Sequence, residues 1–69
     1  MADLAYVQEV LRKVEQELKR TPDSAGEYLA TLVRVKRRGL ALLGIQDPHE
    51  FDFEASEFLR NVEVLLPNL

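Results

Sequence analysis

The strongest constraint on the fold is the spacing of apolar residues in the first third of the chain. Leucine and valine alternate there at intervals of three and four residues, at Leu4, Val7, Leu11, Val14 and Leu18. This spacing places them on one face of an α-helix, which turns once every 3.6 residues or so, at about 100° per residue. Asp3 is suited to cap the first turn, and the Thr21-Pro22 pair stops the helix. The pattern predicts an amphipathic helix over residues 3–20.

A second helix is predicted after a short break. Ser24 and Glu27 have the spacing of a capping box, in which Ser24 caps the helix and Glu27 reaches back to its backbone. Gly44 stands where a left-handed glycine closes a helix. The pattern predicts a helix over residues 25–43, and the short connection predicts an antiparallel hairpin of the first two helices.

The apolar surface of this second helix covers about half of its circumference, which is wider than the stripe of an ordinary surface helix. We expect one part to pack against the first helix, through Leu29, Val33, Leu40 and Leu43. A single neighbour does not cover the rest, and uncovered apolar strips are typical of interfaces. The residues predicted to contact another subunit or a partner protein are Tyr28, Leu32, Val35, Lys36, Gly39 and Leu42.

Two residues within this apolar arc leave alternatives open. Lys36 either lays its stem along an interface with its ammonium in solvent, or is a buried, paired lysine that sets the register between subunits. A catalytic Lys36 is the least favoured reading, because no other reactive group joins it. Gly39 costs about 1 kcal/mol relative to alanine inside a helix. It indicates either a close approach by another backbone or an imperfect helix.

The last third of the chain carries a weaker helical pattern. The Asp47-Pro48 pair resembles a second helix start, with proline in the first turn. Apolar residues then repeat with helical spacing, which predicts a third, shorter helix over residues 53–66. The alternative is a β-hairpin that pairs residues 50–54 with 62–66. The expected fold class is all-α, with a single domain spanning residues 1–69.

The size of the chain limits how such a domain is stabilised. A chain of 69 residues buries only roughly 60% of its unfolded surface. The absence of cysteine removes disulfides and thiolate zinc sites, and the single histidine, His49, does not supply a metal cage. We therefore expect no metal and no other cofactor. Partner subunits are the remaining source of extra stability, so we expect a homo-oligomer.

The net charge of −3 is unevenly distributed along the chain. Residues 27–46 carry one acid against four bases, whereas residues 47–69 carry six acids against one base. The basic segment can therefore face the acidic one, within a chain or between chains. The candidate phosphate contacts are Arg34, Arg37 and Arg38, although the net negative charge of the chain repels nucleic acid.

No set of residues indicates an enzyme. Ser24, Ser56 and His49 are the candidates for nucleophilic catalysis, but Ser24 is explained as a helix cap. The chain has neither a G-x-S-x-G elbow nor a glycine-rich phosphate loop. The longest uncharged run, residues 39–46, is far shorter than the roughly 20 residues of a membrane span, and no signal peptide is visible. We expect a cytoplasmic protein, in the host cytoplasm if the chain is viral, with no membrane partner.

The segment from Arg37 to Pro48, RRGLALLGIQDP, resembles a segment of phage small-terminase proteins. In that family a helix with paired arginines ends in Leu-Leu-Gly-Leu, followed by an acidic residue and proline. The resemblance covers about a dozen residues, together with the helix start at Tyr28-Leu29, and this chain has one extra residue between the arginines and the leucine pair. The family's N-terminal helix-turn-helix is missing here. The resemblance implies a helical hairpin that assembles into a ring and helps a motor engage viral DNA.

Three functions follow from these observations. The first is a non-catalytic helical module for self-association, in its narrower form the ring-forming core of a phage DNA-packaging adaptor. The second is a small regulator that docks an apolar helix onto a partner protein. The third is a small DNA-binding protein that uses the basic second helix.

Overall fold

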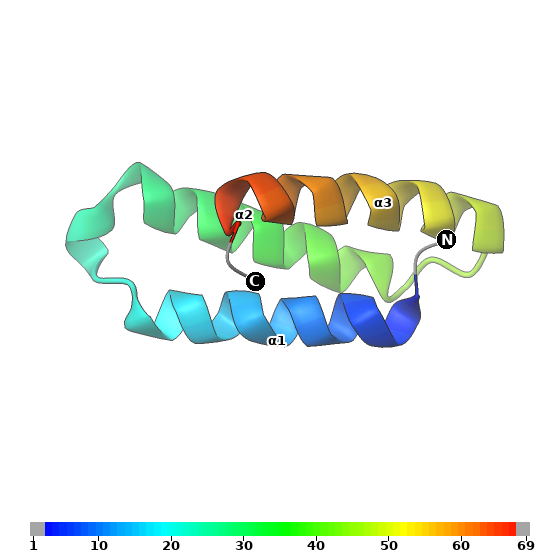
Figure 1. Ribbon diagram of the computed structural model, residues 1–69, viewed down its shortest axis with the longest axis horizontal. Coiled ribbons are helices and arrows are strands. Elements are labelled where there is room, and N and C mark those ends of the chain that lie inside the picture. Colours follow the sequence, from blue (N-terminus) through cyan, green and yellow to red (C-terminus); the bar gives the residue numbers. More distant parts are fainter. Residues whose placement is uncertain (1–2, 68–69) are drawn as a thin grey trace.

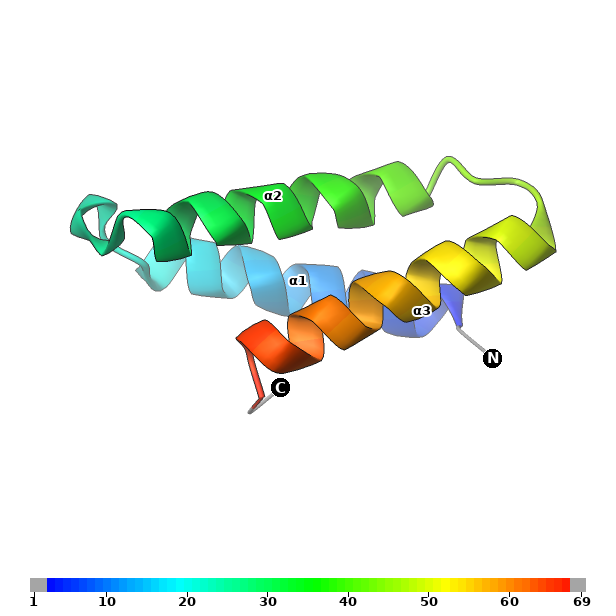
Figure 2. The ribbon, with the colours of Figure 1, turned by 90° about the horizontal axis from the view of Figure 1, so that it is seen from above.

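The computed structural model describes residues 3–67, which form three α-helices and no strand (Figure 1). The helices are α1 (Leu4–Arg20), α2 (Glu27–Leu42) and α3 (Pro48–Leu65), with a 3₁₀ turn, η1 (Asp23–Ala25), between the first two. Helix α2 runs antiparallel to both neighbours and packs against both, whereas α1 and α3 contact each other much less (Figure 2). The all-α prediction is confirmed, and for the described residues the β-hairpin alternative is wrong.

All three helices contribute to one hydrophobic core. Its buried members are Val7, Val10, Leu11, Val14, Leu32, Leu42, Ala55, Phe58 and Val62. The buried Gly39 lies among them, where a Cβ would stand 2.5 Å from Leu11 Cδ2 and 2.8 Å from Phe58 Cζ. Real Cβ atoms do not approach other atoms so closely, so a glycine lets α2 approach both neighbours. The close approach predicted at Gly39 is present, but the atoms nearest to it belong to side chains of both neighbours and not to another backbone.

Helix α1 matches its prediction. The Asp3 carboxylate accepts a hydrogen bond from the Ala5 amide at 3.1 Å, which caps the first turn. At the other end Thr21 is extended, and its hydroxyl donates to the Glu17 carbonyl at 2.6 Å. Proline after Thr21 excludes a further helical turn, so α1 ends where the sequence indicated.

The predicted capping box at the start of α2 is wrong. Ser24 lies inside η1, and the N-cap of α2 is Gly26, which caps with no side-chain hydrogen bond. Gly26 has φ 61° and ψ −116°, a conformation that only glycine adopts readily. The chain therefore turns at Gly26, and Ser24 stands too early to cap the helix that begins at Glu27.

The end of α2 also differs from the prediction. The helix ends at Leu42, and Gly44 does not take the left-handed conformation that was expected of it. Instead the Leu43, Gly44 and Ile45 amides each donate to the carbonyl three residues before, at 3.1 Å. These tighter turns satisfy the last carbonyls of the helix without a positive φ.

Helix α3 begins earlier than the apolar repeat predicted. The Asp47 carboxylate accepts a hydrogen bond from the His49 amide at 3.0 Å, and Pro48 occupies the first helical position. This local start signal decides the boundary, so residues 48–52 are helical as well. The third helix has 18 residues and is the longest of the three, so the expectation of a shorter one is wrong.

None of the helices in residues 3–67 has the length and apolar character that crossing a membrane requires.

Candidate functional site

Half of the residues predicted for an intermolecular surface lie inside the chain's own core. Leu32 and Leu42 are 0% and 2% exposed, and Gly39 is buried with them. By contrast Leu40 and Leu43, which were expected to pack against the first helix, are 47% and 43% exposed. The reason is that α2 has two neighbours, so its buried face points between α1 and α3 rather than at α1 alone.

Lys36, another predicted interface residue, is engaged within the chain. Its ammonium lies 3.9 Å from the Glu15 carboxylate of α1, and its side chain is 37% exposed. This arrangement corresponds to the first interpretation of Lys36, in which the stem lies along a helix interface and the charge stays in solvent. A solvated pair of this kind contributes at most about 1 kcal/mol to stability.

The remaining predicted interface residues, Tyr28 and Val35, are half-buried and line a groove on the side of the molecule where α2 and α3 meet. We call it the α2–α3 groove. It encloses about 990 Å³, and it is lined by Tyr28, Thr31, Arg34, Val35, Arg38, Asn61, Val64 and Leu65. Its floor is apolar and two guanidinium groups lie at its edge. Three other hollows among residues 3–67 are smaller, at about 230 to 360 Å³.

Among residues 3–67, the two most exposed large apolar side chains belong to this side of α3. Val64 is 81% exposed and lines the groove, and Phe53 is 64% exposed. They stand about three turns apart on one face of the helix. Sequence reasoning missed both residues. No sequence pattern could have found them, because Glu57 and Arg60 stand between them on that face and no apolar repeat connects the two.

The three candidate phosphate contacts all lie on the exposed side of α2. Arg34 and Arg38 line the α2–α3 groove, and Arg37 does not. The Arg38 guanidinium donates to the Glu54 carboxylate of α3 at 3.2 Å. Among residues 3–67, Arg34 and Arg37 make no ion pair. The structure therefore brings the basic helix next to the acidic one, and of the three arginines only Arg38 is paired with α3 among residues 3–67.

A small hydrogen-bond network connects α1 to the end of the groove. The Tyr28 hydroxyl donates to Glu17 at 2.9 Å, and Arg20 donates to the other oxygen of the same carboxylate at 2.7 Å. Both hydrogen bonds favour the ionised carboxylate, Tyr28 more than Arg20, and lower the pKa of Glu17. Burial, and then the carboxylate beside it, raise the pKa of the Tyr28 hydroxyl. Tyr28 is thereby held in place at the groove.

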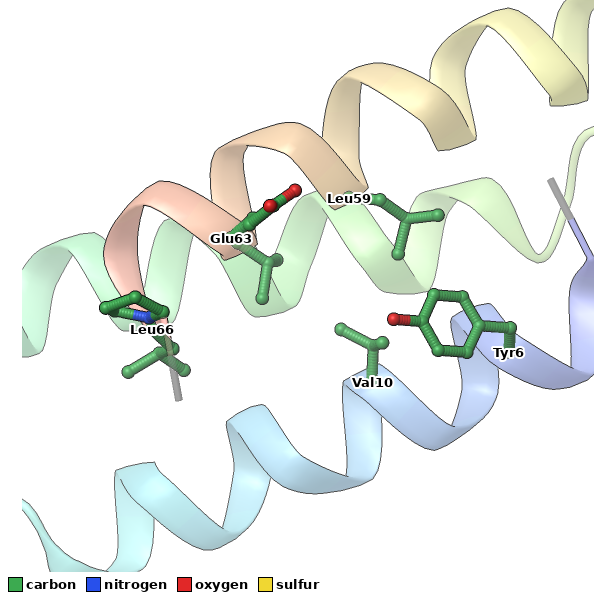
Figure 3. A pocket seen from close by; sticks show the side chains of 7 residues that line it. Tyr6, Val10, Leu59, Glu63 and Leu66 are labelled. Atoms are coloured by element: carbon green, nitrogen blue, oxygen red, sulfur yellow. The ribbon is translucent and has the colours of Figure 1, made fainter. Parts of the chain in front are cut away.

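The opening between α1 and α3 holds two smaller pockets, of about 310 and 360 Å³ (Figure 3). Figure 3 shows Tyr6 and Val10 of α1 facing Leu59 of α3 across the first of them, with the Glu63 carboxylate pointing away from α1. Leu66 and Pro67, which follow α3, line both pockets. Glu63 is the one charged residue that lines the first pocket, and charges of both signs line the second.

The candidate catalytic residues are not brought together. Ser24 is in η1, His49 and Ser56 are on α3, and all three side chains are exposed. Among the described residues, no three histidine, cysteine or acidic side chains are grouped so that they could hold a metal ion.

The chain matches no protein-family model, no curated protein and no solved structure.

Proposed function

We propose that this chain is a non-catalytic helical module that acts by self-association. The observation that carries the proposal is the α2–α3 groove, an apolar hollow with Val64 projecting from its edge. Val64 is 81% exposed, and Tyr28, Val35 and Leu65 form the apolar floor beside it. Interfaces use apolar surface of this kind, and a chain of 69 residues gains stability when a partner covers it.

A narrower form of this proposal follows from the resemblance to phage small-terminase proteins, in which the module is the ring-forming core of a DNA-packaging adaptor. The support for it is the resembling segment from Arg37 to Pro48 and the hairpin of α1 and α2. In this form Arg34, Arg37 and Arg38 contact DNA. Salt-dependent retention of the purified chain on DNA tests that contact, since phosphate binding weakens steeply as salt rises.

The test of self-association is the molar mass in solution, measured by light scattering over a wide concentration series. A mass that rises from 7.9 kDa toward a fixed multiple supports the proposal. Val64→Glu should shift the mass toward the monomer, because a carboxylate would be buried at the interface. Val64 is preferred to Val35, since Val35 also packs against the chain's own core and its replacement would disturb the fold.

The matched control is Gln8→Glu on α1, which places a glutamate at another exposed position, away from the groove. It should leave the mass unchanged. A mass of one chain at every concentration would overturn self-association and favour the second function, docking of the groove onto a different protein.

A further inference from the structure

We propose that the occupant of the α2–α3 groove is the same groove of a second copy, arranged so that α2 of each copy lies across α3 of the other. This inference rests on the proposed self-association and adds its geometry. Three observations support it: the charges on the two helices beside the groove, the absence of an ion pair at Arg34 among residues 3–67, and the exposure of Val64.

The two helices that border the groove carry opposite charges on the faces beside it. The α2 side, which we call the basic wall, presents Arg34 and Arg38. The α3 side of the groove is lined by Asn61, Val64 and Leu65. Beyond this lining, the same face of α3 carries Glu50, Glu54 and Glu57, which we call the acidic wall. Of these five charged side chains, only Arg38 and Glu54 form an ion pair with each other among residues 3–67. Glu57 is 3.8 Å from Arg60 of its own helix, and Arg34 has no ion pair among residues 3–67.

This charge pattern selects one of two symmetric arrangements. Two identical surfaces facing each other are related by a two-fold axis that lies in the interface. An axis across the groove would set α2 against α2 and α3 against α3, so that like charges would meet. An axis along the groove sets the basic wall of each copy against the acidic wall of the other. The second arrangement is therefore favoured. In it, each α2 packs antiparallel against α3 of the other copy, so that four helices form two packed layers.

The same axis fixes which residues meet, because rotation about it leaves positions along the groove unchanged. The contact of Arg38 with Glu54 shows that these two residues share one position along the antiparallel helices α2 and α3. Arg34 lies about 6 Å from Arg38 along α2, and Glu57 lies about 4.5 Å from Glu54 in the same direction. Arg34 of one copy therefore meets Glu57 of the other.

The same register also determines which residue Val64 contacts in the other copy. It lies about 15 Å beyond Glu54 along α3, and Tyr28 lies about 15 Å beyond Arg38 along α2. Val64 of each copy is therefore placed over Tyr28 in the groove of the other. Val64 is the most exposed large apolar side chain of the described residues, and one symmetric contact covers it in both copies.

Charge reversal tests the pairing of Arg34 with Glu57. Arg34→Glu and Glu57→Arg should each weaken self-association roughly tenfold, since each places two like-charge pairs in the symmetric contact. The double variant should restore most of the affinity, because its two chains again place opposite charges at positions 34 and 57, with the signs exchanged. Lys19→Glu is the matched control. It makes the same change in net charge on α1, which does not border the groove, and should leave the affinity unchanged. Circular dichroism of each variant checks that the helices persist.

Cysteine cross-linking gives a second measurement, which the absence of native cysteine makes clean. In an oxidised mixture of the Arg34→Cys and Glu57→Cys chains, the expected product is the mixed disulfide dimer. A cross-link formed equally well by Arg34→Cys alone would support the axis across the groove and overturn the arrangement.

The outcomes separate this inference from the proposed function. A monomer at every concentration overturns both. Self-association that the charge variants do not change, or that the double variant does not restore, overturns the arrangement and leaves self-association standing.

Discussion

Gly39 of α2 lies under the aromatic ring of Phe58 in α3, so closely that a Cβ on Gly39 would stand 2.8 Å from Phe58 Cζ. Leu11 of α1 presses on the same point from the other side. The missing side chain at one position therefore sets how closely the central helix approaches both of its neighbours. This contact explains why a helix-weakening residue stands in the middle of α2.

Gly39→Ala should destabilise the fold by up to about 2 kcal/mol in net terms, because overfilling a packed core costs about 1–3 kcal/mol. Alanine is the better helix former by about 1 kcal/mol, but that gain is smaller than the cost of displacing two buried side chains. The free energy of unfolding in urea measures the difference. Gly44→Ala is the control, because its Cβ would meet only the Ala41 carbonyl at an ordinary 3.6 Å. A Gly39→Ala chain as stable as the wild type would contradict the packing described here.

Gly26 is required for its backbone conformation and not for space. No atom lies within 4 Å of its Cβ position, and its φ is 61°. L-alanine at this position should cost about 1–2 kcal/mol through backbone strain alone. D-alanine should stabilise the fold by about 0.4–1 kcal/mol, since φ 61° and ψ −116° mirror an ordinary extended conformation. Chemical synthesis of the chain and thermal unfolding give the comparison, and equal effects of the two enantiomers would refute it.

Tyr28→Phe should make the stability of the chain less sensitive to acid. The Tyr28 hydroxyl is the main cause of the lowered pKa of Glu17 in the folded state. A lowered folded-state pKa stabilises the fold above the ordinary pKa of a glutamate, and that stability is lost as the pH falls through the folded-state pKa. Without the hydroxyl, the pKa of Glu17 should rise toward its ordinary range. Titration of the Glu17 carboxyl by NMR, with unfolding in urea on both sides of that range, measures both effects. An unchanged Glu17 titration would contradict the hydrogen bond.

Asp47→Ala should destabilise α3 by about 1 kcal/mol, because the His49 amide would lose its hydrogen-bond acceptor. Asp47→Asn keeps a side-chain oxygen at the N-cap and should retain most of the stability. Amide hydrogen exchange in the first turn of α3 locates the loss, which should not extend to α1. If Asp47→Ala and Asp47→Asn behave alike, the cap does not hold the start of α3.

How far the sequence predicted the fold depends on how local each signal was. Asp3 and the Asp47-Pro48 pair act on the next two or three residues, and both helix starts have the capping geometry that these residues indicate. At Ser24 two local signals competed, and the conformation of Gly26 decided the start of α2. The amino-acid sequence alone does not show whether a capping box or a glycine turn decides where the helix begins.

The buried face of α2 depended on information that is not local. The apolar arc was recognised, but its centre depends on where α1 and α3 stand, and the start of α3 had been placed too late. For this reason Leu32 and Leu42 were assigned to an outer surface although both are buried. Val64 and Phe53 were passed over for a related reason, because only the packed position of α3 shows which of its apolar residues remain uncovered.

The position of α2 between its neighbours also bears on how the chain folds. Each helix packs chiefly against the helix next to it in sequence, α1 with α2 and α2 with α3. Such short-range pairing gives a low contact order, and helical domains of this kind fold in about microseconds to milliseconds. A first hairpin can form on either side of α2, so α1 and α3 can join it in either order. Helix α2 belongs to every such route, and a defect within it slows all of them.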